Sequence, residues 1–324
     1  MLFSVLLFAV GLVLLIKGGD WFVDGATGIA KRFNLPDIVV GATVVSIGTT
    51  LPEVMVSTTG ALQGSGAMAY GNAIGSIICN TALIAAISIV CNPGPVNTKS
   101  MKTPAIFFFA SAGLYCLASY VLGTFPRWMG FVMLGIFVTY MILTVRNGMA
   151  NPDEAEEEEE EEGKQRTLLM ELILLVVGAA VIAVGADLLV EHGQIIAIGL
   201  GVPETVVALL FVALGTSLPE LVTTITSLKK GRASLGVGNV IGANVFNLVL
   251  VSGVAVSLAP FPVPCENFLL DTGLNMSLVF EIPVMLGVMS LMIFPALATK
   301  KLGRWQGIAL LGIYVAFCIC QFML

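Results

Sequence analysis

The sequence predicts an all-α membrane protein with ten transmembrane helices in two inverted five-helix repeats, and with broken helices at a central site. Three observations predict this fold class. The chain of 324 residues is 57% hydrophobic and 11% charged, with a mean hydropathy of +0.98, whereas soluble domains carry roughly 25% charged residues. Its apolar segments are long enough to cross a bilayer. One of these segments also recurs, with its proline and glutamate, in the second half of the chain.

Ten apolar segments follow one another along the chain, each about as long as a membrane-spanning helix must be. Hydropathy places them at 2–30, 36–61, 68–91, 104–122, 127–146, 168–194, 203–228, 234–258, 276–296 and 304–322. The first and sixth are long, and we expect them to tilt or to extend past the bilayer. The N-terminus lacks the basic region of a cleavable signal, so we interpret its apolar stretch as the first span.

Positive charges distinguish the two sides of the membrane. In the ten-span arrangement, 13 of the 15 Lys and Arg side chains fall on one side, Arg127 falls on the other, and Lys17 lies within the first span. The positive-inside rule makes the richer side cytoplasmic. We therefore expect a multi-pass protein of the plasma membrane with both termini outside and the loop 147–167 in the cytoplasm.

The two halves of the chain are related by a constant offset. Residues 48–53 (GTTLPE) recur 167 positions later as residues 215–220 (GTSLPE). Five spans per half is an odd number, so the second half enters the membrane from the opposite face, which defines inverted repeats. The predicted domains are a first repeat at 1–146, an acidic linker at 147–167 and a second repeat at 168–324.

The linker carries the net charge of the protein. Nine of the 21 acidic residues lie between Asp153 and Glu162, and the rest of the chain holds 12 acidic residues against 15 Lys and Arg. The formal charge of −6 therefore comes from this run and implies neither an acidic nor a basic partner. We interpret the run as a solvated spacer between the halves, with peripheral attraction of cations as the alternative.

Each copy of the repeated motif places a glutamate directly after a proline inside an apolar span. Glu53 and Glu220 are candidates for a functional site, because ionisable residues are costly in lipid. Proline removes the helical hydrogen bond of the carbonyl four residues earlier. Carbonyls in the turns 46–49 and 213–216 are thus expected to point into the protein, where freed carbonyls are tolerated. Oxygen donors of this kind suit hard cations, Ca2+ in particular.

Further oxygen donors are expected around the two glutamates. Hydroxyls come from the motif and from the span that follows it, and amides come from that following span: Thr49, Thr50, Thr216, Ser217, Ser76, Asn72, Asn80, Asn239, Asn244 and Asn247. Glycines at 71, 75, 238 and 242 are expected to let these helices approach closely. The charge of −2 on the glutamates matches one Ca2+ or two Na+, and a third Na+ would need neutral oxygens.

These motifs resemble those of prokaryotic sodium/calcium exchangers of the cation/calcium antiporter (CaCA) superfamily. The resemblance rests on residues 41–53 and 71–80 in the first half and on 212–220 and 238–247 in the second. It implies a secondary active antiporter that exchanges Na+ for Ca2+ by alternating access, with four cation sites among the repeat helices. It also implies that the first and sixth helices slide across that core. No cofactor is expected beside the transported ions, no nucleic acid is expected as a partner, and a monomer is expected to suffice.

The resemblance also implies a role for individual positions. Glu53 and Glu220 match central Ca2+ ligands, and Thr49 and Thr216 match donors of backbone and hydroxyl oxygens. The remaining matches are carbonyl donors at Ser46 and Ala213 and first-half polar ligands at Ser76 and Asn80.

Two positions depart from the archaeal pattern. Ala243 stands where that pattern has a serine equivalent to Ser76, so one Na+ site lacks a hydroxyl. Asn247 stands where some members carry aspartate, which argues against dependence on K+.

Other functions remain open on the residues alone. A proton/Ca2+ antiporter would use the same glutamates, but that branch usually has a different motif around them. A passive channel would place its selectivity ring on an axis between subunits, whereas this chain builds its site from its own two halves. An enzyme is not expected, because the chain has one histidine and no serine or cysteine with an evident base.

Overall fold

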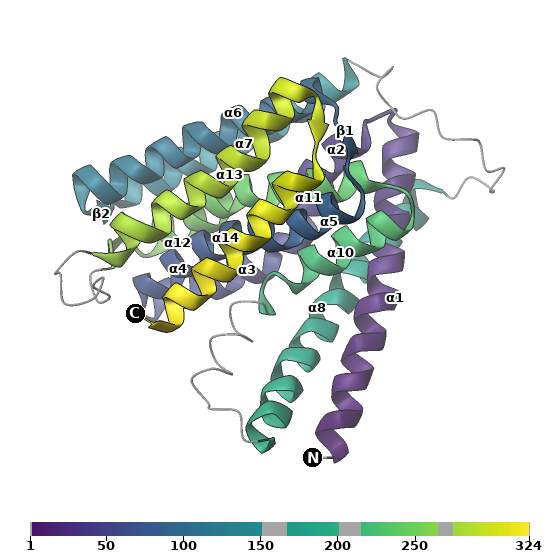
Figure 1. Ribbon diagram of the computed structural model, residues 1–324, viewed down its shortest axis with the longest axis horizontal. Coiled ribbons are helices and arrows are strands. Elements are labelled where there is room, and N and C mark those ends of the chain that lie inside the picture. Colours follow the sequence, from purple (N-terminus) through teal and green to yellow (C-terminus); the bar gives the residue numbers. More distant parts are fainter. Residues whose placement is uncertain (1, 151–166, 201–214, 265–274, 324) are drawn as a thin grey trace.

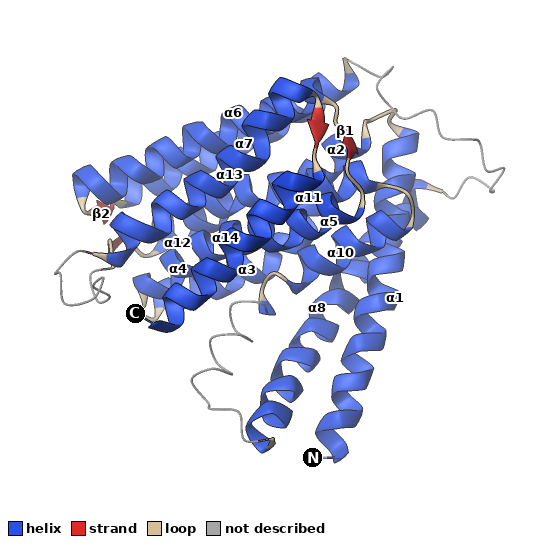
Figure 2. Cartoon of the chain, viewed as in Figure 1, coloured by secondary structure: helices blue, strands red, loops and turns tan. Residues whose placement is uncertain are grey.

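The computed structural model describes residues 2–150, 167–200, 215–264 and 275–323, and these are almost entirely helical (Figure 2). Among the described residues, nine helices are long and apolar enough to cross a membrane. The predicted span at 203–228 falls partly outside them, and its described part forms a helix from Leu218 to Lys229. The predicted all-helical membrane fold is therefore confirmed.

The first half of the chain forms, in order, α1 (Leu2–Arg32), α2 (Asp37–Val40), the π-helix η1 (Gly41–Val45), α3 (Ser46–Leu62), α4 (Gly66–Cys79), the π-helix η2 (Asn80–Ala85), α5 (Ala86–Cys91), β1 (Gly94–Pro95), α6 (Thr98–Cys116), the π-helix η3 (Leu117–Leu122), β2 (Thr124–Phe125) and α7 (Arg127–Met149). The second half forms α8 (Leu168–Gly199), α10 (Leu218–Lys229), α11 (Ala233–Phe246), the π-helix η5 (Asn247–Val251), α12 (Ser252–Leu258), β3 (Phe261–Pro262), the π-helix η7 (Ser277–Glu281), α13 (Ile282–Thr299), β4 (Lys301–Leu302) and α14 (Arg304–Met323).

The repeat in the sequence is also a repeat in the structure. Helix α11 begins and ends 167 residues after α4 (66 to 233 and 79 to 246), and η5 begins 167 residues after η2 (80 to 247). Strand β3 follows β1 at this same offset of 167 (94 to 261), and β4 follows β2 at an offset of 177 (124 to 301). Strand β1 pairs with β4 and β2 pairs with β3, both antiparallel. Equivalent strands thus lie in different sheets, as expected when equivalent loops face opposite sides of the membrane.

Helices α1 and α8 form a pair at the edge of the molecule. Figure 1 shows the two long helices, purple and teal, running side by side and extending away from the other helices. Glycines bring their backbones together: a Cβ on Gly18 would lie 2.9 Å from the Ile182 nitrogen, and a Cβ on Gly25 would lie 2.7 Å from the Leu175 nitrogen. Close approach through small residues is how membrane helices associate without a hydrophobic driving force. The prediction that the first and sixth spans are long is confirmed, with 31 and 32 residues.

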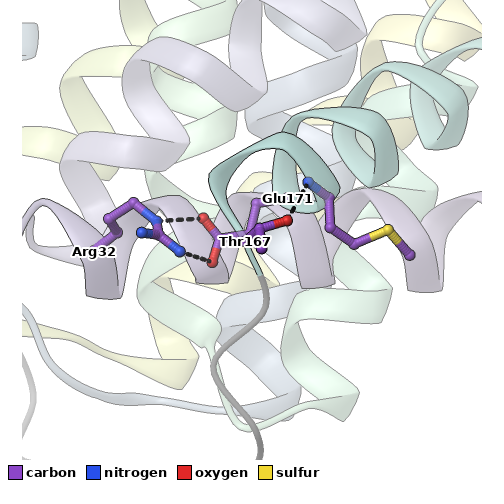
Figure 3. Close-up of polar contacts among 4 residues, drawn as sticks. Arg32, Thr167 and Glu171 are labelled. Atoms are coloured by element: carbon purple, nitrogen blue, oxygen red, sulfur yellow. Dashed lines mark hydrogen bonds and ion pairs between the residues drawn. The ribbon is translucent and has the colours of Figure 1, made fainter.

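An ion pair joins the C-terminus of α1 to the N-terminus of α8. Arg32 Nε donates to Glu171 Oε2 at 2.9 Å and Arg32 Nη2 donates to Glu171 Oε1 at 3.3 Å, with Thr167 capping the start of α8 beside them (Figure 3). The fork of two bonds adds directional specificity. Each charge also complements the dipole at its helix end. The contact ties the two outer helices together at one end.

The α11–α12 span, in contrast, is the centre of the fold. In the most apolar window of this span, 83% of the residues are buried, against 28% in α1 and 22% in α8. The predicted close approach of helices is confirmed at two glycines: a Cβ on Gly238 would lie 2.8 Å from Ile38 Cα, and one on Gly242 would lie 2.6 Å from Ala42 Cα. It is not found at Gly71 and Gly75, which have nothing within 4 Å among the described residues. The close crossing in the described core thus joins α11 of the second half to α2 and η1 of the first half.

Candidate cation-binding site

Two glutamates occupy the middle of the helical core. Glu53 on α3 and Glu220 on α10 are both 0% exposed, and the two helices contact one another across the two halves. None of their four carboxylate oxygens has a hydrogen-bond partner among the described residues. An uncompensated buried carboxylate costs several kcal/mol, so two of them would consume much of the ~5–15 kcal/mol that stabilises a typical folded protein. The buried charge therefore requires compensation, either by protonation of the carboxylates or by a bound cation.

The two copies of the motif fold differently around their prolines. In the second copy, residues 216 and 217 form a turn and α10 begins at Leu218, with Pro219 in its first turn, where proline is well tolerated. Glu220 thus lies at the positive end of the helix dipole. In the first copy, α3 continues through Pro52 without a break, and the irregular turn is the π-helix η1 that directly precedes α3.

Side-chain hydroxyls form hydrogen bonds to two backbone carbonyls of η1. The Ser46 hydroxyl donates to the Gly41 carbonyl at 2.8 Å, and the Tyr140 hydroxyl donates to the Ala42 carbonyl at 2.7 Å. A π-helix loosens the regular pairing of carbonyls, and such turns occur frequently at functional sites. The proline pattern predicted freed carbonyls at 46–49. The irregular backbone of this copy lies just before them, at 41–45. The role of the Ser46 carbonyl itself stays a prediction.

Two asparagines mark the start of matching π-helices beside the glutamates. Asn80 begins η2 and Asn247 begins η5, and both are fully buried. Helix α10 packs against η2 and helix α3 packs against η5, so each glutamate helix meets the asparagine segment of the other half. Both amide atoms of Asn80 and the Oδ1 of Asn247 have no hydrogen-bond partner among the described residues. The Asn247 amide nitrogen donates to the Ala243 carbonyl at 3.0 Å.

The motif hydroxyls divide into two kinds. Those of Thr50 and Ser217 are buried and have no hydrogen-bond partner within the described part of the chain. Those of Thr49 and Thr216 donate to asparagine side chains of the opposite half, at 3.2 Å and 3.4 Å. Ser76 is also buried, at 3% exposure. The structure thus buries most of these hydroxyls and joins two of them to asparagines of the opposite half.

Ala243 is fully buried on α11, whereas Ala213 lies outside the described residues.

The hydrogen bonds of Asn244 do not support the expectation that it supplies an amide to the site, although its buried Oδ1 has no hydrogen-bond partner among the described residues. Its Nδ2 donates to Thr81 Oγ1 at 2.7 Å and lies 3.2 Å from Met289 Sδ, so it bonds to a threonine and a methionine outside the motif. A signal for this was present in the sequence: the repeat equivalent of Asn244 is Ile77, an apolar residue.

One buried hydroxyl near the glutamates was missed at the level of sequence. Thr223 is 0% exposed, and its hydroxyl has no hydrogen-bond partner among the described residues. It lies three residues after Glu220, a spacing that places both on one helix face. That spacing was the available signal. The repeat equivalent of Thr223 is Val56, so a search restricted to residues shared by both halves passes over it.

Comparison with known proteins gives consistent results. A family model described as "Sodium/calcium exchanger protein" matches residues 3–146 and 170–323. The sodium/calcium exchanger MaX1 of Methanosarcina acetivorans is 30% identical, over 98% of this chain and 98% of its own. An uncharacterized membrane protein of Methanocaldococcus jannaschii is 33% identical, over 95% of this chain and 94% of its own. A solved structure of the sodium-calcium exchanger NCX_Mj, soaked with Na+ and Sr2+, is similar with a TM-score of 0.79 and 32% identity, covering 97% of both chains.

Proposed function

The chain belongs to the sodium/calcium exchanger family, and from this premise we propose how its own residues carry out the exchange. The protein is a multi-pass membrane antiporter that exchanges Na+ for Ca2+ by alternating access. Glu53 and Glu220 are the central ligands of the transported ions. The observation that carries this assignment is the set of four carboxylate oxygens, fully buried and without a protein donor in the described part of the chain.

Neutral oxygens complete the proposed site. The hydroxyls and amides gathered around the glutamates are hard donors, which suit Ca2+ and Na+ better than transition metals. We assign to the site, beside the glutamates, Ser46, Thr49, Thr50, Ser76, Asn80, Ala213, Thr216, Ser217, Ala243 and Asn247. Ala213 is included by its place in the repeated motif, and Ala243 as the position equivalent to Ser76.

Charge balance explains why the two ions compete. The two carboxylates carry −2, so one Ca2+ or two Na+ neutralise the buried charge, whereas both together would leave an excess. An excess charge in a buried site costs several kcal/mol. Binding of Na+ therefore favours release of Ca2+, and the reverse holds too. A third Na+ would rely on neutral donors such as Asn80 and Thr49.

The orientation in the membrane follows from the positive charges. With the first repeat at 1–146 and the second at 168–324, the richer side is cytoplasmic by the positive-inside rule. We propose that the protein lies in the plasma membrane with both termini outside and the linker 147–167 inside. The exchange of strand partners between the two sheets supports the inverted relation of the repeats. Because both halves of the site come from one chain, a monomer suffices for exchange.

Replacing either glutamate by glutamine tests the assignment. Glu53→Gln or Glu220→Gln keeps the side-chain volume but removes half of the charge, so Na+-dependent Ca2+ uptake into proteoliposomes should fall to near background. The matched control is Glu281→Gln, since Glu281 is the last residue of η7 and accepts hydrogen bonds from Ser277 and Gln321. The control should transport as the unmodified protein does. Normal Na+-dependent uptake by both motif variants would overturn the assignment. Uptake driven by a pH gradient without Na+ would point to protons as the counter-ion.

A further inference from the structure

Two asparagines reach across the interface between the halves of the site. Asn72 on α4 and Asn239 on α11 are repeat equivalents (72 and 239, offset 167). Thr216 Oγ1 donates to Asn72 Oδ1 at 3.4 Å, and Thr49 Oγ1 donates to Asn239 Oδ1 at 3.2 Å. Each amide therefore holds a motif hydroxyl that belongs to the other half of the chain.

The orientation of the Asn72 amide is determined by its neighbours. Its Nδ2 donates to Ser57 Oγ at 2.8 Å and to the Glu53 carbonyl at 3.2 Å. A backbone carbonyl can only accept a hydrogen bond, so the amide nitrogen must face it. The Oδ1 atom is thereby turned toward Thr216, whose hydroxyl must act as the donor.

Asn239 is arranged in the same way, but in the described part of the chain its amide nitrogen lacks the hydrogen bonds that orient Asn72. It is 0% exposed, and its Oδ1 faces Thr49 as that of Asn72 faces Thr216. Its backbone carbonyl oxygen lies 2.9 Å from Ser46 Oγ, whose single proton is shared with the Gly41 carbonyl. The equivalent of Ser57 is Thr224, yet neither Thr224 Oγ1 nor Asn239 Nδ2 has a hydrogen-bond partner among the described residues. The contacts of the Asn239 side chain thus lie almost entirely with the motif of the first half.

A hydroxyl has one proton and two lone pairs. If the proton is given to an amide oxygen, both lone pairs remain available to a cation. Without that acceptor the proton can rotate toward the cation and oppose its binding. We propose that Asn72 and Asn239 are positioning residues, which hold the hydroxyls of Thr216 and Thr49 with their lone pairs toward the transported ion. This inference rests on the proposed function of the motif and extends it to two residues that need not touch the ion.

The test is a double-mutant cycle on the full-length protein in proteoliposomes. Asn239→Leu removes the acceptor at similar volume, and Thr49→Val removes the hydroxyl. Each should weaken the apparent affinity for Na+ or for Ca2+ by about fivefold to tenfold, the effect of one hydrogen bond. The double variant should be no weaker than Thr49→Val alone, because the amide acts only through that hydroxyl. The cycle of Asn72→Leu with Thr216→Val repeats the test in the other half if one variant does not fold.

Asn244→Leu is the matched control. It removes an equally buried asparagine of α11 whose Nδ2 contacts Thr81 and Met289, both outside the motif. We expect a loss of thermal stability with unchanged ion affinity. The proposal is overturned if Asn239→Leu leaves both affinities unchanged or if its effect adds in full to that of Thr49→Val. If the affinities stay unchanged while Glu53→Gln and Glu220→Gln abolish transport, only the positioning role fails. If the glutamate variants transport normally, the proposed function fails instead.

Discussion

Ala243 is a predicted ligand position at which the two halves differ in chemistry. Its equivalent is Ser76, and both are buried. Ala243→Ser should add a hydroxyl oxygen where the first half already has one. A neutral contact of this kind contributes on the order of 1 kcal/mol, which corresponds to a roughly fivefold change in affinity. The Na+ dependence of exchange in proteoliposomes should therefore shift to lower Na+ concentration.

Two comparisons make this prediction specific. The affinity for Ca2+ measured without Na+ should change much less, because we assign its main ligands to the two glutamates. Ala86→Ser adds the same hydroxyl to a fully buried alanine that packs against Gly307 of α14, and it should leave the Na+ dependence unaltered. An unchanged Na+ dependence in Ala243→Ser would show that position 243 does not contribute to a Na+ site.

At the scale of elements, α1 and α8 pack most extensively against each other, and both also contact α10 of the core. The Arg32–Glu171 pair lies within this two-helix unit. Lys230, in the turn between α10 and α11, lies 2.6 Å from Asp24 on α1 and so ties the unit to the core. These charges are partly exposed, and pairs of this kind contribute roughly 1 kcal/mol or less. Such a tie is weak enough to break and re-form during transport.

This arrangement predicts which cross-links stop exchange. If α1 and α8 slide together across the core, a short bifunctional thiol reagent joining Asp24→Cys to Lys230→Cys should block transport. The same reagent joining Arg32→Cys to Glu171→Cys should leave transport largely intact, because both positions belong to the moving unit. Flux would be measured before and after cross-linking in a background without other cysteines. Equal inhibition by both cross-links would contradict movement of the two helices as one unit.

At the scale of the whole molecule, the inverted repeat predicts which loops share a side of the membrane. An exposed cysteine at Gln63, after α3, should react with an impermeant thiol reagent from outside the cell. A cysteine at Ala150, after α7, should react only once the cytoplasmic side is opened. The measurement is labelling of intact cells against inverted vesicles, with the cysteine-free protein as control. Labelling of both positions from one side would contradict the proposed orientation.

The sequence by itself determined the membrane fold and the family, and it singled out Glu53 and Glu220 as candidate ligands. Hydropathy and charge are properties of contiguous residues, so they predict spans without knowledge of their neighbours. The repeated motif is equally local, and its second occurrence at an offset of 167 residues separates Glu53 and Glu220 from the other acidic residues. Whether a single polar residue such as Asn244 faces the site was ambiguous, because the helix period alone does not show which neighbour a side chain contacts.

Only the tertiary structure decided how the halves meet. It shows α3 continuing through Pro52 while α10 starts at Leu218, one residue before the equivalent proline, although the two motifs are nearly identical. It pairs Asn72 with Thr216 and Asn239 with Thr49, contacts between residues 144 and 190 positions apart. Such contacts depend on the packing of helices that the local pattern treats as independent. The physical reason is that burial and hydrogen-bond partners depend on the whole fold, whereas hydropathy and repeats are local properties of the sequence.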